Sequence, residues 1–196
     1  MYFDLEKLWL ISGHSQSRRV VPIHNLVATM ESELIDILPA IHALTGCDTT
    51  SKVGTKAKAL IKGKKGVYTL LCNFGKEEIN GEINTGTEKF FLKFITSRDV
   101  ESFDDLRFLI YHTKHHQFDR EWFPPTSACI KQHIFWVYLQ CYMWFHAPFT
   151  EDIQVNFLDC GYILADDEHL LPVIMAEAPI PDEFPAPCNC LKCAKP

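Results

Sequence analysis

No segment of the 196-residue sequence is apolar for long enough to cross a membrane, because a spanning helix needs about 20 consecutive apolar residues. The N-terminal stretch MYFDLEKLWLISG also lacks the basic residues that open a secretory signal. We therefore expect an intracellular protein with no membrane contact. In a reducing compartment its eight cysteines would remain free thiols.

The composition is that of a globular chain, with 47% hydrophobic and 22% charged residues. The length fits one compact domain or two small ones. A chain of this size can bury a substantial core.

Acidic residues are absent between Thr49 and Gly66, although the whole chain has a formal charge of −6. The same window contains six lysines and so carries +6, which leaves −12 on the remainder. Such asymmetry indicates a surface that faces an anion. The alternative is a solvated, lysine-rich helix face. The six are Lys52, Lys56, Lys58, Lys62, Lys64 and Lys65.

Hydrophobic periodicity predicts an α+β fold that is mainly helical. Short strands are expected at Leu8–Ser12 and Arg19–Ile23, joined by a polar turn. Apolar residues at helical spacing follow from Leu34 to Leu44, with a kink or break at Pro39 and a stop at Gly46.

Further helices are predicted along the rest of the chain, with residues 73–87 as a loop and a strand hairpin within GYILADDEHLLPV. The longest helix starts after Pro124–Pro125–Thr126 and is apolar all round, which is typical of a central buried helix. The predicted helical segments are Thr55–Lys62, Lys65–Phe74, the stripe from Phe90 to Ile95, Phe103–His112 and Ser127–His146.

Asp48 is the first candidate site residue. An aspartate in a short loop after an apolar helix is a common way to present a ligand to Mg²⁺, which prefers carboxylate, water and phosphate oxygens. Hydrolysis of a phosphodiester by two such metals requires several converging carboxylates, and Asp48 would be one of them. Alternatively, Asp48 is a turn residue that bonds the backbone of Thr50 or Ser51.

The segment that follows, Val53 to Lys56, favours phosphate binding. Gly54 would let the backbone approach an anion, and the unpaired N–H groups of a helix starting at Thr55 would face it. Lys56, Lys58 and Lys62 would add positive charge along that helix. The expected partner is therefore nucleic acid, bound through its phosphates.

Three cysteines close the sequence after a proline-rich linker. Cys188, Cys190 and Cys193 have the C-x-C-x-x-C spacing that suits zinc, but a tetrahedral zinc site needs four ligands. The alternative is a disordered tail with reduced thiols.

Three motifs together resemble a group of mobile-element-associated animal proteins, and through them the flap-endonuclease branch of the PIN-like nucleases. The first is the TGCDTT segment and the helix before it. The second is the helix PPTSACIKQHIFWVYLQCYMW, with His133 and Trp144, and the third is the Ala-Pro linker with the C-x-C ending. The residues that carry the first motif are Leu38, Pro39, His42, Ala43, Leu44, Thr45, Gly46, Cys47, Asp48, Thr49 and Thr50.

The resemblance implies three parts. Residues 1–66 would be a partial PIN-like segment, with a remnant of the α/β sheet and a helix–hairpin–helix-like region. Residues 67–176 would be a helical region ending in a small strand unit, and residues 177–196 the proline- and cysteine-rich tail. The chain departs from the pattern in that the acidic segments expected earlier are missing. Lys52 also replaces the first hairpin glycine, and Trp136 replaces an expected basic residue.

The resemblance therefore implies a transposon-derived, nuclear, DNA-associated module that lacks a complete active site. Asp48 would be the remnant of a magnesium-dependent, structure-specific nuclease site, and we expect no activity from the chain alone. The alternative function is a protein–protein interaction domain without nucleic-acid binding, in which Asp48 is purely structural.

Overall fold

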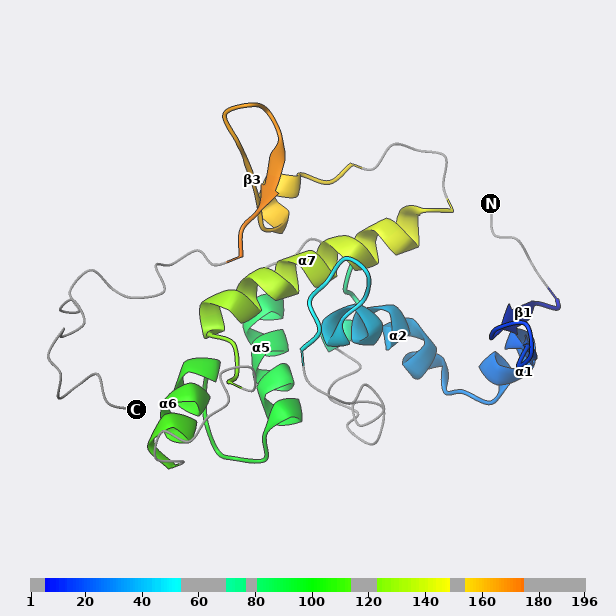
Figure 1. Ribbon diagram of the computed structural model, residues 1–196, viewed down its shortest axis with the longest axis horizontal. Helices are drawn as coiled ribbons and strands as arrows, with labels where there is room; N and C mark the ends of the chain where they lie inside the picture. Colours follow the sequence, from blue (N-terminus) through cyan, green and yellow to red (C-terminus); the bar gives the residue numbers. More distant parts are fainter. Residues whose placement is uncertain (1–5, 54–69, 77–80, 114–122, 149–153, 175–196) are drawn as a thin grey trace, which may run out of the picture.

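The computed structural model describes residues 6–53, 70–76, 81–113, 123–148 and 154–174, and it shows a mainly helical α+β protein (Figure 1). The described strands form two separate antiparallel pairs, β1 with β2 and β3 with β4. The predicted α+β, mainly helical class is thus confirmed. The predicted helix Thr55–Lys62 and the first part of Lys65–Phe74 lie outside the described residues.

Helix α7 (Ser127–His146) is the centre of the molecule, with the extent that the sequence predicted. The Thr126 hydroxyl caps its start by accepting a hydrogen bond from the Cys129 N–H at 3.2 Å. Helices α2 (Ser32–Thr45), α5 (Gly81–Ile95) and α6 (Phe103–Thr113) all contact α7 (Figure 1).

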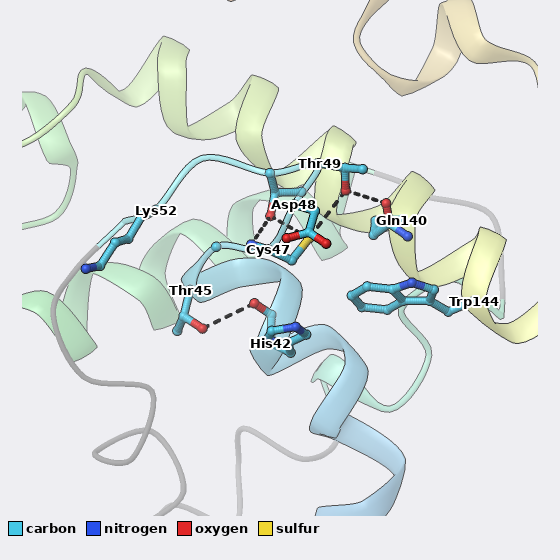
Figure 2. A pocket seen from close by; sticks show the side chains of 10 residues that line it. His42, Thr45, Cys47, Asp48, Thr49, Lys52, Gln140 and Trp144 are labelled. Carbon is cyan, nitrogen blue, oxygen red and sulfur yellow. Dashed lines mark hydrogen bonds between the residues drawn. The ribbon is translucent and has the colours of Figure 1, made fainter. Parts of the chain in front are cut away.

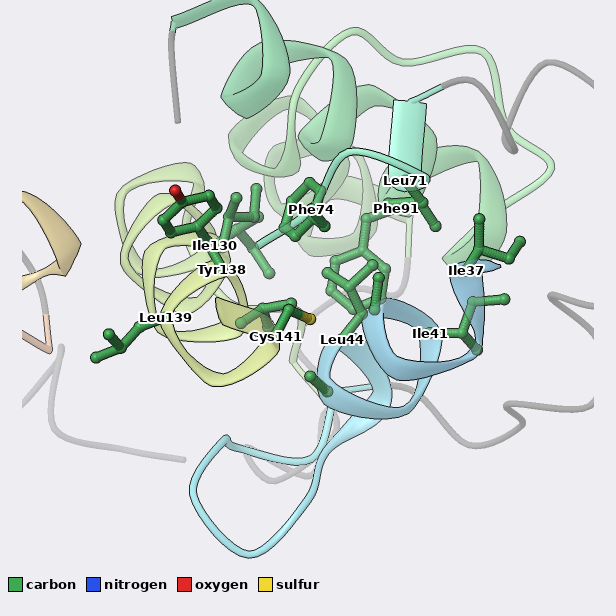
Figure 3. Packing of buried hydrophobic residues seen from close by; sticks show 14 of the residues in the cluster. Ile37, Ile41, Leu44, Leu71, Phe74, Phe91, Ile130, Tyr138, Leu139 and Cys141 are labelled. Carbon is green, nitrogen blue, oxygen red and sulfur yellow. The ribbon is translucent and has the colours of Figure 1, made fainter. Parts of the chain in front are cut away.

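The core lies between these helices. Side chains from α2, α5 and α7 meet there with Leu71 and Phe74 from the segment between α2 and α5 (Figure 3). Large side chains that are less than 2% exposed include Ile37, Leu44, Leu71, Phe74, Phe91, Phe103, Leu106, Ile130, Ile134 and Val137. Removing a side chain of this kind typically costs about 2–5 kcal/mol, so this cluster holds α2 firmly against α7.

Helix α2 buries the face that its periodicity predicted, with Ile37, Ala40, Ile41 and Leu44 inside. It runs without a break through Pro39, so the expected break does not occur. A proline removes one backbone hydrogen bond, and packing of the buried face against α7 keeps the helix continuous. The helix ends where predicted, at Gly46, whose φ of 109° suits a residue without a Cβ.

One predicted loop is only partly right: residues 73–76 form turns as predicted, but the second part does not. Residues 73–87 were expected to be irregular because they contain several Gly and Asn, yet α5 already begins at Gly81. Thr87 is fully buried on this helix, one turn before the buried Phe91. Tertiary packing therefore outweighs the weak helix propensity of Gly81 and Gly86.

The two hairpins lie at the periphery. Strand β1 (Trp9–Ser12) pairs with β2 (Arg19–Pro22), and the short helix α1 (Ile23–Ala28) follows directly. Near the other end of the described chain, the 3-10 helix η2 (Phe157–Cys160) leads into β3 (Tyr162–Leu164), which pairs with β4 (Leu170–Pro172). Both strand pairs were predicted from the sequence, while descent of β1 and β2 from a PIN-like sheet remains a prediction.

Trp136 anchors the second hairpin to α7. Its indole Nε1–H donates to the carbonyl of Gly161 at 3.0 Å, directly before β3. Gly161 has a φ of 79°, and a Cβ there would lie 3.0 Å from the same Nε1 atom. The tryptophan that stands in place of an expected basic residue thus has a structural role.

Candidate functional site

The loop after α2 folds back tightly on itself. A Cβ at Gly46 would lie 2.6 Å from the Cα of Lys52, so only a glycine lets the two backbones approach this closely. The TGCDTT segment therefore forms a compact turn that begins and ends at the C-terminus of α2.

Thr50 holds this turn together. Its hydroxyl donates to the carbonyl of Ala43 at 2.7 Å and accepts from the N–H of Cys47 at 3.1 Å. The side chain is only 6% exposed. The Ala43 carbonyl also accepts from the Gly46 N–H at 3.3 Å, so the Thr50 hydroxyl is a second donor to this carbonyl, and it closes the loop across three residues.

Asp48 lies at the tip of the turn and is exposed. Among the described residues, none donates a hydrogen bond to its carboxylate. The nearby Cys47 N–H donates to the Thr50 hydroxyl. The alternative reading, in which Asp48 bonds the backbone of Thr50 or Ser51, is not seen. The carboxylate is therefore available to solvent or to a ligand.

An open pocket of about 570 Å³ lies between this loop and α7 (Figure 2). The Thr49 hydroxyl donates to the Oε1 atom of Gln140 on α7, which ties the loop to that helix. The rings of His42 and Trp144 stack with centroids 5.7 Å apart and planes 11° apart. The lining residues are His42, Thr45, Gly46, Cys47, Asp48, Thr49, Thr50, Lys52, Gln140 and Trp144.

Cys47 lies within the turn, with its Sγ atom 3.3 Å from the Thr49 hydroxyl and 3.2 Å from the Thr50 hydroxyl. Burial alone would raise the pKa of this thiol, but hydrogen bonds from Thr49 and Thr50 outweigh burial and lower it. Both hydroxyls also serve other acceptors, Gln140 and the Ala43 carbonyl. A thiolate at Cys47 would therefore compete with the bonds that hold the loop.

His133 on α7 contacts the end of α2, directly before the TGCDTT loop. It is 3% exposed, and its Nε2–H donates to the carbonyl of Leu44 at 2.9 Å. Its ring stacks on Phe91 with centroids 6.0 Å apart. Burial lowers the pKa of His133, and the hydrogen bond to Leu44 only partly opposes this. The imidazole is therefore neutral in the fold and fixes the end of α2 on α7.

The structure brings together only part of the predicted site. Asp48 and Lys52 line the same pocket. Within the described ranges, no group of three or more His, Cys, Asp or Glu side chains could hold a metal ion. The remaining predicted site residues lie outside the described residues: Gly54, Thr55, Lys56, Lys58, Lys62, Cys188, Cys190 and Cys193.

Sequence reasoning did not assign His42, Gln140 or Trp144 to the site. His42 lies one turn before the TGCDTT segment, and Gln140 and Trp144 share a face of α7 at the i, i+4 spacing. Gln140 is a polar residue within the mostly apolar second half of α7, and this was the signal in the sequence. Its partner Thr49 is 91 residues away in the sequence, which no local pattern can reveal.

Compared with known proteins, the chain matches no family model, no curated protein and no solved structure.

None of the described helices combines the length and the apolar character needed to cross a membrane.

Proposed function

We propose that the chain is a nucleic-acid-associated module that binds DNA through its phosphates. The binding edge would consist of the loop after α2 and the lysine-rich segment that follows it in the sequence. One observation carries the proposal: the pocket beside this loop is open, and Lys52 on its rim is the first of the six lysines. The remainder of the chain carries −12, so a polyanion would be attracted to this edge alone.

The same geometry argues against hydrolysis by this chain alone. Among the residues that the structure describes, Asp48 is the single carboxylate that lines the pocket. In-line displacement at a phosphate uses metal ions held by several carboxylates, and one aspartate holds Mg²⁺ weakly. The pocket residues therefore do not fit a catalytic magnesium site. We propose descent from a nuclease of the PIN-like flap-endonuclease type, with Asp48 as a remnant, and a nuclear location.

Substitution of two lysines tests the binding edge. Lys56→Ala together with Lys58→Ala should weaken binding of a fluorescent DNA strand by a similar factor for every base sequence, because phosphates carry no sequence information. The matched control is Lys89→Ala with Lys93→Ala, two exposed lysines on α5. Anisotropy titrations in which both double variants bind equally would contradict the proposal.

The tail would hold zinc only with a fourth ligand from elsewhere, because Cys188, Cys190 and Cys193 supply three. We expect clearly less than one equivalent of zinc in the purified chain. One stoichiometric zinc that is lost in Cys190→Ser would show that the tail is a complete metal site.

A second candidate function is a protein–protein interaction domain, and the two hairpins favour it. Consecutive residues of a strand point to opposite faces. Leu10 and Ile11 in β1 and Ile163 and Leu164 in β3 are nevertheless all 52–67% exposed, so both faces of each hairpin expose apolar side chains. Exposed apolar surface of this kind is typical of contact with another chain. If the wild-type chain binds no DNA even at low salt, this function replaces the first.

A further inference from the structure

The pocket beside the TGCDTT loop has one aromatic wall and one amide, in addition to its charged rim. His42 comes from α2 and Trp144 from α7, and their stacked rings form one side (Figure 2). Aromatic side chains of this kind are the surfaces on which proteins stack bases that have left a duplex. We infer that the pocket receives one unpaired base of the DNA strand whose phosphates lie along the lysine-rich edge. This inference rests on the proposed function.

The dimensions suit such a ligand. At about 570 Å³ the pocket falls within the range of roughly 300–1,000 Å³ that is usual for small-ligand sites. His42 is exposed, whereas Trp144 is half-buried against the core. Packing therefore fixes the Trp144 ring, while the His42 ring is accessible to a ligand, as a stacking surface requires.

Gln140 supplies a group that can contact the edge of a base. The side chain is 8% exposed, and its Oε1 atom accepts from Thr49. This bond fixes the amide plane, and Figure 2 shows the amide nitrogen on the side of Trp144. The NH₂ group carries two donors, and at that position it would meet the ring nitrogen or carbonyl acceptors of a base stacked on the aromatic wall.

The charges on the rim orient the strand. Asp48 repels phosphate, while Lys52 attracts it, and Figure 2 shows Lys52 on the opposite side of the loop from Trp144. The backbone would therefore pass along the Lys52 side and the base would turn toward Trp144. A base inside a duplex is stacked on both faces and cannot turn in this way without unpairing. The pocket thus selects single-stranded DNA over duplex DNA.

The test compares strands that differ only in their bases. A labelled single strand, the same strand with abasic nucleotides at its centre, and the corresponding duplex are titrated with the intact chain. We expect the normal strand to bind about 5- to 150-fold more tightly than the abasic strand, the range that one base stacked on an aromatic ring supplies. Phosphate contacts are the same in both strands, so the difference reports the pocket alone.

Two pocket variants and one matched control complete the test. His42→Ala removes an exposed ring and should bring the normal strand down to the affinity of the abasic strand, which itself should not change. Trp144→Leu should do the same if its circular dichroism shows a folded chain. Phe108→Ala, at an aromatic residue that is 67% exposed on α6, should leave the difference between the strands intact.

The other outcomes refute the inference in distinguishable ways. Equal binding of normal and abasic strands would overturn the base pocket but leave phosphate binding in place. Duplex binding as tight as that of the single strand would do the same. Displacement of the strand by a free deoxynucleoside monophosphate at similar concentration would make the pocket a small-molecule site instead. Binding of no strand at all would overturn both this inference and the proposed function.

Discussion

Replacing Thr50 with valine removes the group that holds the TGCDTT turn while keeping its shape. The hydroxyl donates to the Ala43 carbonyl at 2.7 Å, accepts from the Cys47 N–H at 3.1 Å and lies 3.2 Å from the Cys47 Sγ atom. Each such bond contributes roughly 0.5–1.5 kcal/mol, and a buried group left without a partner costs about 1–3 kcal/mol. Because Thr50 is 6% exposed, water cannot easily replace the hydroxyl. We expect the free energy of unfolding to fall by about 2–3 kcal/mol.

Urea denaturation followed by circular dichroism measures this loss as a lower transition midpoint with an unchanged slope. The control is Thr45→Val, because the Thr45 hydroxyl donates to Ile41 O within the same helix and is only part-buried. That variant should change the free energy by less than about 0.5 kcal/mol. Equal losses in the two variants would refute the reasoning that Thr50 closes the loop.

Three other variants probe the same region. Gly46→Ala should destabilise the fold by roughly 1–3 kcal/mol, because Gly46 has a φ of 109° and a Cβ would meet the Lys52 backbone. The control is Gly86→Ala on α5, where only the side chain of Leu70 must move. This control should be near neutral in the same urea assay. Burial lowers the pKa of His133 in the fold below the ordinary value of 6.5. The free energy of unfolding should therefore be undiminished above pH 6.5 and decrease at lower pH by at most about 1.4 kcal/mol per pH unit. A wild-type pH profile identical to that of His133→Gln would contradict this. Asp48→Asn should leave DNA affinity unchanged or raise it, because one repelling charge is removed, and a clear loss of binding in anisotropy titrations would show that the carboxylate takes part.

Much of the helical core could be predicted because its signal is local. The burial of Ile37, Ile41 and Leu44 follows from spacing alone, and the Thr126 cap defines the start of α7. The loop predicted for residues 73–87 is wrong from Gly81 onward, because packing of buried side chains outweighs the turn preference of Gly and Asn. There the buried Phe91 and Thr87 extend the helix instead.

The site was predictable only on one side. The sequence drew attention to Asp48 and to the lysines, since charge and its asymmetry are visible without a structure. The opposite wall, made by Gln140 and Trp144, belongs to a helix whose sequence is apolar all round and is read as core. Only the tertiary pairing of α2 with α7 brings that wall to Thr49.

The salt dependence of DNA binding by the wild-type chain tests the central claim most directly. A fluorescent single strand is titrated at several salt concentrations with a chelator present, so that no divalent metal contributes. Each neutralised phosphate releases counterions and adds about −0.7 to the log–log slope of affinity against salt. We predict measurable binding at low salt with a steep slope that becomes about one to two units flatter in the Lys56→Ala, Lys58→Ala variant. No binding at low salt, or a slope that these substitutions leave unchanged, would contradict the account.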